Sequence, residues 1–508
     1  MTELLHALLR NAEQRGAETA FADDDAALSW EQLAERVGGA LTALDERKET
    51  IGIAGGNGTE WVVAFLAAWL AGKTIVPIPT FFSAGQVARL VADAGVQRII
   101  ATDTAALRMC KTTVPNLPTI TLPEARAPLS AQPARCNGGL IIHTSGSTGR
   151  PKGVRLEHGQ PLWTARTLAQ AVGANARDRY LSLLPLPMLL EIICAIFIPV
   201  LVGGSTFLAR QVAQAVPEGR PVDLLSLFDQ VRPSRSVMVP QLLALYARQL
   251  AQAGRTVPDS LTFVAVGGAP VPAAVASLAR QVGIPFFVGY GLSECGSVVS
   301  LNLPEAARDG SAGRPLPGLR VEIEAGEIVV SGPPLMDGYT LGDRTLDDCS
   351  NGATAPQRWR TGDLGRLDKN GFLHVLGRKD NLLVTAAGRN ITPEWIESMV
   401  QGDARLHACV LTLSPAHAGP GMLVIPTRQG EAWLQPDARE ELLRLLQRAC
   451  ASAPAHARPQ WVETVSPEQA LQAGLLRADG SVNRAAVRAF IARRHASVPE
   501  KEHQHDAI

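Results

Sequence analysis

The sequence predicts an α/β fold: a large N-terminal domain with doubly wound sheets, and a small α+β domain at the C-terminus. Strand-like and helix-like segments alternate over residues 50–102, which is the pattern of parallel sheets covered by helices. Residues 261–266 are continuously apolar, as expected of a parallel strand buried on both faces. The length of 508 residues exceeds that of a typical single domain.

The expected elements of the N-terminal part follow one another closely. Apolar runs predict strands, helical patterns separate them, and a Pro- and Thr-containing connector precedes one more apolar strand. The strands are residues 50–54, 74–77, 97–102 and 139–143, the helices are 60–71 and 86–94, and the connector is 103–138.

Residues 192–209 carry no charged side chain and therefore raise the question of a membrane span. A spanning helix needs about 20 predominantly apolar residues, whereas Pro199 and the Gly-Gly-Ser-Thr run at 203–206 interrupt this stretch. The interruption favours a buried helix, a turn and a buried strand over a transmembrane segment.

The C-terminal part contains shorter elements. In residues 320–331, polar and apolar side chains alternate around a central Ala-Gly-Glu, which indicates a hairpin. Residues 373–376 and 382–385 are two further short strands, and the last 128 residues have the pattern of a small α+β domain.

The domains are expected at 1–380 and 381–495, followed by a disordered polar tail at 496–508. His503 and His505 in this tail could bind a metal. A mobile tail is the preferred interpretation, because polar termini are commonly poorly ordered.

Composition excludes several classes of protein. Hydrophobic residues make up 46% and charged residues 19%, which argues against wholesale disorder. Lys plus Arg and Asp plus Glu both total 48, so there is no basic excess for a dedicated nucleic-acid binder. Seven scattered Cys without a CxxC pair argue against a disulfide framework and a cysteine zinc site. We expect a cytoplasmic protein, because the N-terminus lacks a signal peptide.

The strongest local signal is an apolar strand that leads into a loop of small hydroxyl and glycine residues and then Lys152. Glycines let backbone N–H groups approach and surround an anion, and a lysine adds a point charge. The spacing differs from that of a P-loop. The pattern indicates a phosphate site, with a flexible surface loop as the alternative.

This loop, TSGSTGRPKG at residues 144–153, resembles the phosphate-binding signature of the adenylate-forming (ANL) superfamily. The superfamily includes acyl-CoA synthetases, peptide-synthetase adenylation domains and luciferases. The resemblance implies an AMP-binding domain with doubly wound sheets and a distorted barrel, and a mobile small domain. It also implies that the nucleotide is bound by Thr144, Ser145, Gly146, Ser147, Thr148, Gly149 and Lys152, with Thr148 also close to Mg²⁺.

Two more motifs match the superfamily in order. The loop Gly267-Gly268-Ala269 resembles its adenine pocket, and Tyr290-Gly291-Leu292-Ser293-Glu294 resembles its Y-G-x-[ST]-E motif. The resemblance implies that Tyr290 stacks near adenine, Ser293 donates to the α-phosphate and Glu294 helps to hold Mg²⁺. One carboxylate plus substrate phosphates is a common way to bind Mg²⁺.

The remaining matches lie toward the domain junction. Asp363, in Thr-Gly-Asp, matches the aspartate that accepts hydrogen bonds from the ribose hydroxyls. Arg378 and Asp380, in Gly-Arg-Lys-Asp, match a nucleotide-binding arginine and the hinge. Gly388 matches a glycine of the thiol (pantetheine) tunnel. The segment 389–397 is similar to that of long-chain acyl synthetases.

The sequence departs from the superfamily at Ser481, which occupies the place of the adenylation lysine. Losing one electrostatic donor costs roughly 10²–10³ in rate, so adenylation is expected to be slow unless another cation serves. Arg477 and Arg484 are candidates, although a surface arginine is the preferred interpretation for each. Thioester formation from a preformed acyl-adenylate would not need this lysine.

Met188 follows Leu-Pro-Leu-Pro, where many acyl-CoA synthetases place a histidine or aromatic residue beside the acyl pocket. An adaptable apolar side chain suits an acyl chain, although ordinary core packing explains it equally well. No Asp that could bind an amino-acid amine stands in this run. These features favour a fatty or other aliphatic acid.

The sequence therefore predicts an AMP-forming acid–thiol ligase that uses ATP, Mg²⁺ and CoA or the phosphopantetheine of an acyl carrier protein. A carboxylic acid is activated to an acyl-adenylate, with release of pyrophosphate, and is then transferred to the thiol with release of AMP. The alternative is a catalytically impaired homologue that binds nucleotide or acyl-adenylate, which Ser481 motivates.

Overall fold

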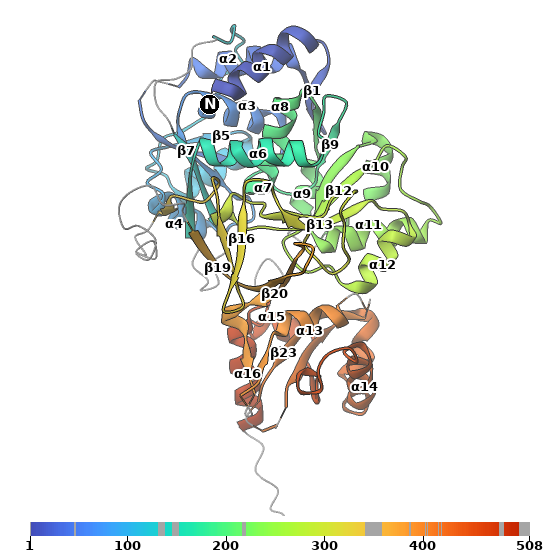
Figure 1. The fold of residues 1–508 in the computed structure, drawn as a ribbon. Coiled ribbons are helices and arrows are strands. Elements are labelled where there is room, and N and C mark those ends of the chain that lie inside the picture. Colours follow the sequence, from blue (N-terminus) through green and yellow to red (C-terminus); the bar gives the residue numbers. More distant parts are fainter. Residues whose placement is uncertain are drawn as a thin grey trace, which may run out of the picture. The chain divides into compact units, whose positions relative to one another are not determined.

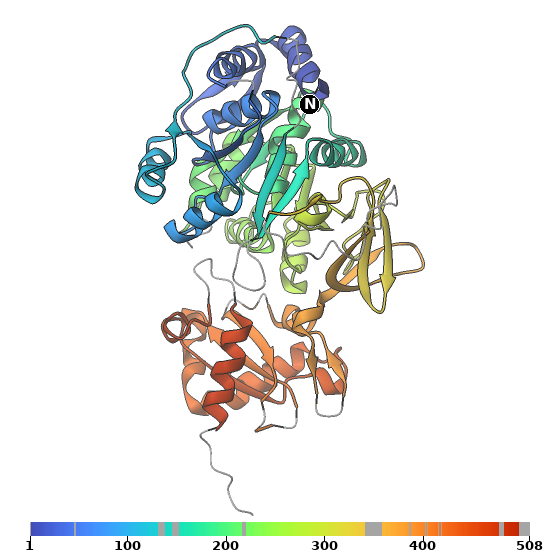
Figure 2. The same ribbon diagram turned by 90° about the vertical axis from the view of Figure 1, so that its left-hand side faces the viewer.

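The computed structural model describes residues 2–44, 47–130, 138–144, 152–215, 220–340, 358–385, 388–401, 403, 405–414, 416–417, 419–476 and 482–496. The chain divides into two compact units, drawn in Figures 1 and 2. The large unit comprises Met1–Ala269, Ala279–Thr361 and Arg366–Val375. The small unit comprises Pro270–Leu278, Gly362–Gly365 and Leu376–Ile508.

Within the described residues, the large unit contains a nine-stranded sheet in the order β15-β14-β13-β12-β11-β9-β10-β1-β2. Strands β13, β12, β11, β9, β10 and β1 run parallel. The bounds are β1 Thr19–Asp23, β2 Ala27–Ser29, β9 Arg179–Ser182, β10 Ser205–Leu208, β11 Arg235–Met238, β12 Phe263–Val266, β13 Phe286–Tyr290, β14 Ser300–Leu301 and β15 Arg314–Pro315.

The same unit holds a seven-stranded sheet, again counted over described residues, in the order β18-β8-β7-β4-β3-β5-β6. Its inner strands are parallel, as the strand–helix alternation predicts. The bounds are β3 Thr50–Ala54, β4 Thr74–Ile78, β5 Arg98–Ala101, β6 Thr119–Ile120, β7 Gly139–Thr144, β8 Lys152–Glu157 and β18 Gly338–Tyr339.

Helices cover these sheets, and α3 (Thr59–Leu70) lies between them. It contacts β3 and β4 of one sheet and β1 of the other, and nearly all its residues are buried. A helix that is apolar on every side is stable only in such a place. The other large-unit helices are α1 Thr2–Arg15, α2 Trp30–Leu41, α4 Ala84–Asp93, α5 Thr104–Thr113, α6 Gly159–Ala171, α9 Arg210–Ala215, α10 Leu224–Val231 and α11 Pro240–Gln252; α12, Ala273–Gln281, crosses the unit boundary.

The expected connector at 103–138 is partly wrong, because it contains α5 and β6. The Asp103 side chain caps α5 by accepting a hydrogen bond from the Ala106 amide. Ala106 and Cys110 then bury the inner face of the helix. One capping residue and two buried side chains form too weak a periodic pattern to be distinguished from a loop.

The uncharged stretch folds as expected, as helix, turn and strand. It follows α7 (Leu189–Glu191), begins as a π-helix (η1, Ile192–Phe197), continues as α8 (Ile198–Val202), and turns at Gly203 into β10. Gly203 has φ +79°, a left-handed conformation that favours glycine at a helix end. No helix among the described residues has the length and hydrophobicity needed to span a bilayer.

A third sheet, of four strands in the described residues, has the order β16-β17-β19-β20. The hairpin predicted at 320–331 is confirmed as β16 (Arg320–Glu324) and β17 (Glu327–Ser331), joined through Ala325 and Gly326. Both turn residues have positive φ, the geometry that matches the twist of a two-residue hairpin. Strands β19 (Arg358–Leu367) and β20 (Leu373–Arg378) complete the sheet.

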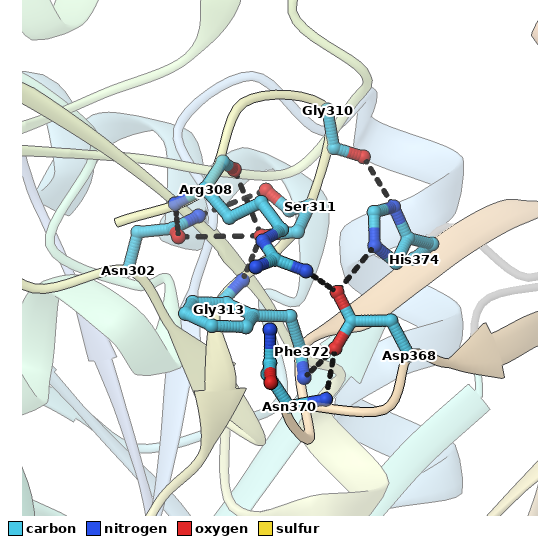
Figure 3. A network of polar contacts seen from close by, with 9 residues as sticks. All are labelled: Asn302, Arg308, Gly310, Ser311, Gly313, Asp368, Asn370, Phe372 and His374. Carbon is cyan, nitrogen blue, oxygen red and sulfur yellow. Dashed lines mark hydrogen bonds and ion pairs between the residues drawn. The ribbon is translucent and has the colours of Figure 1, made fainter. Parts of the chain in front are cut away.

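A polar network fixes the turn between β19 and β20 (Figure 3). The Asp368 carboxylate accepts hydrogen bonds from the amides of Asn370 and Phe372 at 2.8 and 3.1 Å. It also pairs with Arg308, and it lies 3.4 Å from Nε2 of His374. Burial alone would raise the pKa of Asp368, but these hydrogen bonds hold it well below its usual range.

We expect Asp368→Asn to lower the melting temperature of the large unit at pH 7, since the Arg308 pair and the charge-assisted bonds are lost. Because the pKa of Asp368 is lower in the folded than in the unfolded chain, where it is about 3.9, the ionised carboxylate stabilises the fold above about pH 3.9. This stabilisation is lost as the pH falls below about 3.9. The difference between wild type and variant should therefore shrink below about pH 4. Thermal unfolding between pH 3 and 8 measures this; a gap that does not depend on pH would contradict it.

In its described part, the small unit contains the two-stranded sheet β21-β22 and the three-stranded sheet β23-β24-β25, which has an apolar cluster on each face. Met422 and Val424 of β24 face the cluster of α13 and α14, whereas Leu423 and Ile425 face that of α15 and α16. The bounds are β21 Leu383–Val384, β22 Asn390–Ile391, α13 Pro393–Val400, β23 Leu406–Thr412, β24 Gly421–Pro426, α14 Arg439–Ala449, β25 Trp461–Thr464, α15 Pro467–Gln472 and α16 Arg484–Ala496.

Candidate functional site

Three of the predicted site segments leave the same edge of the nine-stranded sheet. Residues 267–269 follow β12, residues 290–294 begin at the end of β13, and residues 183–188 follow β9. These strands are parallel, so their carboxyl ends lie at one edge. Ligands of open α/β sheets bind outside this edge.

Glycines shape two of these segments. A Cβ on Gly291 would lie 1.7 Å from the carbonyl oxygen of Ser297, so any side chain there would displace the following turn. Gly268 has φ +85°, which L side chains rarely adopt. Ser293 and Glu294 then form a short 3₁₀ turn, η2 (Ser293–Cys295), which ends at Gly296 with φ +68°.

The predicted phosphate loop joins two strands of the seven-stranded sheet. Thr144 ends β7, Lys152 begins β8, and the two are paired across the antiparallel ladder. The predicted nucleotide contacts Ser145, Gly146, Ser147, Thr148 and Gly149, and with them the metal role of Thr148, lie outside the described residues.

Lys152 and Glu294 are connected through Tyr339. The Lys152 Nζ atom lies 5.1 Å from the centroid of the Tyr339 ring, a cation–π distance. The Tyr339 hydroxyl donates a hydrogen bond of 2.8 Å to Oε1 of Glu294. The structure thus brings together the predicted phosphate cation and the predicted Mg²⁺ carboxylate, which are far apart in the sequence.

Tyr339 is held in place from two sides. Its strand β18 pairs with β8, with Tyr339 opposite Val154, and the Thr340 amide donates to the carbonyl of Gly153 at 2.9 Å. The Trp359 ring meets Tyr339 edge to face, with centroids 6.1 Å apart. Sequence reasoning missed both aromatic residues, because no local pattern links a Gly-Tyr pair to a lysine in another strand.

His143 precedes Thr144 in β7 and remains neutral at pH 7. Burial lowers its pKa to about 4. Both ring nitrogens are buried without a hydrogen-bond partner among the described residues. Among the described residues at this end of β7 and β8, the positive charge therefore comes from Lys152 and not from this histidine.

In the small unit, Asp363 and Arg378 form an ion pair. Nη1 of Arg378 lies 3.1 Å from Oδ1 of Asp363, and the carboxylate is largely buried. Gly362 beside it has φ +72°, and a Cβ there would lie 3.1 Å from Nη2 of Arg378. Two residues predicted to bind nucleotide are thus in contact; their roles stay predictions.

The predicted hinge and tunnel residues have simpler surroundings. Asp380 lies exposed in the 3₁₀ turn η3 (Lys379–Asn381). Gly388 has φ +70°, and no atom of the described residues lies within 4 Å of the position of an added Cβ. Neither observation tests the proposed roles in hinge rotation or thiol access.

The lysine position, Ser481, and one candidate replacement, Arg477, lie outside the described residues. The other candidate, Arg484, forms a two-pronged ion pair with Glu397, one contact of which is 2.8 Å long. Arg484, at the start of α16, is only partly exposed, unlike the expected surface arginine. The positive charge of Arg484 is thus paired with the Glu397 carboxylate within the small unit.

Met188 is exposed at the end of the loop between β9 and α7, with 38% of its surface accessible. Residues 183–187 before it and Leu189 after it are buried. The alternative of ordinary core packing is therefore wrong for Met188, while its predicted place in an acyl pocket stays a prediction.

The sequence profile of the AMP-binding enzyme family matches residues 8–340. The chain belongs to this family. As an AMP-binding enzyme it contains the predicted large domain with its doubly wound sheets and a small α/β C-terminal unit. The superfamily resemblance of the loop, adenine and Y-G-x-[ST]-E motifs is confirmed at the level of the family.

Curated relatives of this AMP-binding enzyme are CoA ligases. It is 32% identical over 271 residues to the 2-succinylbenzoate–CoA ligase of Bacillus velezensis, covering 51% of this chain and 52% of that enzyme. The chain thus spans about half the length of that relative. It is 28% identical over 428 residues to a feruloyl-CoA synthase of Amycolatopsis, covering 79% and 84%.

Solved structures agree in fold over almost the whole chain. An anthranilate–CoA ligase in complex with anthranoyl-AMP aligns with a TM-score of 0.80 and 21% identity, covering 97% of this chain and 98% of that one. The o-succinylbenzoate–CoA synthetase of Bacillus subtilis, in complex with ATP and magnesium, aligns with a TM-score of 0.76 and 24% identity, covering 94% and 98%.

Proposed function

We propose that the chain is an AMP-forming acid–CoA ligase that activates an aromatic carboxylic acid. The observation that carries the proposal is the contact of Lys152, Tyr339 and Glu294 in the large unit. It places a cation and a carboxylate beside one aromatic ring, next to the end of the phosphate-loop strand. ATP bound with Mg²⁺ needs both: a cation near its phosphates and an oxygen ligand for the metal.

The residues present suit Mg²⁺. The metal prefers oxygen ligands and is commonly bound by one or two carboxylates plus substrate phosphates. Tyr339 hydrogen-bonds Oε1 of Glu294, and within the described part of the chain no hydrogen bond reaches Oε2. We assign Glu294 to hold the ion through Oε2, where Mg²⁺ would neutralise phosphate charge when bound.

In the first step of the proposed reaction, an oxygen of the carboxylic acid attacks the α-phosphorus of ATP. The bond from that phosphorus to the bridging oxygen breaks, and pyrophosphate leaves. Lys152 stabilises the negative charge on the phosphates, and Tyr339 keeps its ammonium in place through the cation–π contact. In the second step the sulfur of CoA attacks the acyl carbon, and AMP leaves.

The acid is proposed to be aromatic because the relatives are named for such acids: succinylbenzoate, ferulate and anthranilate. The sequence-based preference for a fatty acid has no support among them. Met188 is compatible with a ring, since a thioether makes favourable contacts with aromatic edges. CoA is proposed as the thiol because the same relatives are named as CoA ligases or CoA synthases. The non-catalytic alternative, motivated by Ser481, likewise finds no support in these relatives.

The test is a panel of benzoate, anthranilate, 2-succinylbenzoate, ferulate and straight-chain acids of two to eighteen carbons. Each acid is incubated with the full chain, ATP and Mg²⁺, with and without CoA. We expect AMP release and CoA thioester with at least one aromatic acid, and weaker activity with the straight-chain acids. A preference for straight-chain acids would contradict the aromatic assignment, and thioester on a holo-carrier protein alone would contradict CoA.

A further inference from the structure

A buried polar cluster bonds to the loop that precedes Met188 and is not used by the mechanism above. Its two central side chains are Asn57, in the loop between β3 and α3, and Glu191, at the end of α7. Asn57 is 2% exposed and Glu191 is fully buried. Buried polar side chains are costly unless they are hydrogen-bonded, so their partners indicate what they stabilise.

Both side chains bond to the backbone of residues 183–188, the loop that leads from β9 to Met188. The Leu184 amide donates to Oε1 of Glu191 at 3.3 Å. Nδ2 of Asn57 donates to the Leu184 carbonyl at 2.8 Å, and the Leu186 amide donates to Oδ1 of Asn57 at 2.9 Å. Three polar backbone groups of the loop are therefore paired with side chains, one from the β3–α3 loop and one from the α7 helix that follows.

The remaining bonds hold the two central side chains themselves. The hydroxyls of Tyr180 and Ser182 donate to Oε2 of Glu191 at 3.1 and 3.2 Å. Nδ2 of Asn57 also lies 3.5 Å from the Ser182 hydroxyl, which joins the two halves of the cluster. Nε of Arg210 donates to the Asn57 carbonyl at 2.9 Å. Hydrogen bonds from β9, α7, α9 and the β3–α3 loop thus form one network around the 183–188 loop.

The local sequence adds rigidity to the loop. Pro185 and Pro187 fix φ and remove two amide donors, and the Met188 amide closes a turn on the Pro185 carbonyl at 3.0 Å. Glu191 is followed by the π-helix Ile192–Phe197. Such π turns are rare and are found frequently at functional sites. The loop therefore presents one exposed side chain, Met188, from an otherwise buried segment.

We propose that Asn57 and Glu191 are positioning residues for the acid: they hold the 183–188 loop so that Met188 forms a fixed wall of the acid-binding pocket and sets which acids are accepted. This rests on the proposed acid–CoA ligase function. It agrees with the place of the loop, which leaves the same sheet edge as residues 290–294. Preorganised contacts matter because a displacement of about 1 Å can cost 10²-fold in rate.

Conservative and disruptive substitutions of Glu191 should have different effects on the KM for the acid and on acid selectivity. Burial raises the pKa of Glu191 to about 8, although the hydrogen bonds from Tyr180, Leu184 and Ser182 oppose this. Glutamine has the same shape, is neutral and can still accept from the Leu184 amide. Leucine has similar volume but accepts no hydrogen bond. Glu191→Gln is therefore the matched control for Glu191→Leu.

The experiment measures kcat and KM for the acid panel and for ATP with the full chain. We expect Asn57→Ala and Glu191→Leu to raise the KM of the preferred acid by about 10- to 100-fold and to narrow the spread of kcat/KM between acids. The KM for ATP should stay within about twofold. Glu191→Gln should behave like wild type. Met188→Ala, like the two disruptive variants, should reduce the differences in kcat/KM between acids.

Ser182→Ala serves if the two disruptive variants do not fold, since it removes one hydroxyl between Asn57 and Glu191. It should change acid selectivity in the same direction by a smaller factor. Folded variants with wild-type KM and selectivity for every acid would overturn the positioning role and leave the ligase function intact. A wild-type chain that releases no AMP with any acid would overturn both.

Discussion

We expect Glu294→Gln to lower the rate of acyl-adenylate formation by about 10²-fold or more. The Mg²⁺ concentration that gives half of the maximal rate should also rise. The amide oxygen of glutamine can still accept the hydrogen bond from the Tyr339 hydroxyl, so the fold around the site is retained. What is lost is the negative charge that Mg²⁺ needs. Acid-dependent pyrophosphate release, titrated with Mg²⁺, measures both effects.

Tyr339→Phe is the matched control for this prediction. It keeps the ring beside Lys152 and Trp359 but removes the hydroxyl that orients Glu294. The expected loss is smaller, about tenfold, with a modest change in the Mg²⁺ requirement. An unchanged Mg²⁺ titration in Glu294→Gln would show that this carboxylate does not hold the ion.

Ser481→Lys is expected to accelerate acyl-adenylate formation, by roughly 10²-fold where charge stabilisation limits the rate. The reason is the resemblance to adenylate-forming enzymes, which place a lysine here toward the acyl carboxylate and α-phosphate. Arg484 cannot serve instead without breaking its ion pair with Glu397. The rate of AMP formation in single-turnover experiments measures the gain.

The control is Ser481→Met, which adds length without charge and should leave adenylation slow. Transfer of a synthetic acyl-adenylate to CoA should proceed at the same rate in wild type and in both variants, because that half-reaction does not need the lysine. Equal adenylation by the Lys and Met variants would contradict the electrostatic explanation.

The sequence predicted those parts of the fold that depend on local patterns. Apolar runs separated by helical segments gave the parallel strands β3, β4 and β5, and the alternation around Ala325 and Gly326 gave a hairpin. Helix α5 was missed because its stability comes from one cap and two buried side chains. Its local signal is too weak to compete with the surrounding Pro and Thr residues.

The candidate site could be predicted only where its residues lie together in one contiguous sequence motif. The Gly267 and Tyr290 segments could be located because each is a short contiguous motif that resembles one of the superfamily's motifs. Tyr339 was not predictable, since its contacts to Lys152 and Glu294 exist only after three separate segments have packed. The same holds for Glu191, which reads as one charge at the start of an apolar run but accepts three hydrogen bonds in the core.

The central claim is that the chain converts an aromatic acid and ATP into an acyl-adenylate and then a CoA thioester. Mass spectrometry of reactions without CoA, and then with CoA, tests it most directly. We expect an acid-dependent acyl-adenylate in the first reaction, and equal amounts of AMP and aryl-acyl-CoA in the second. The absence of both products with every acid, in wild type and in Ser481→Lys alike, would contradict the claim.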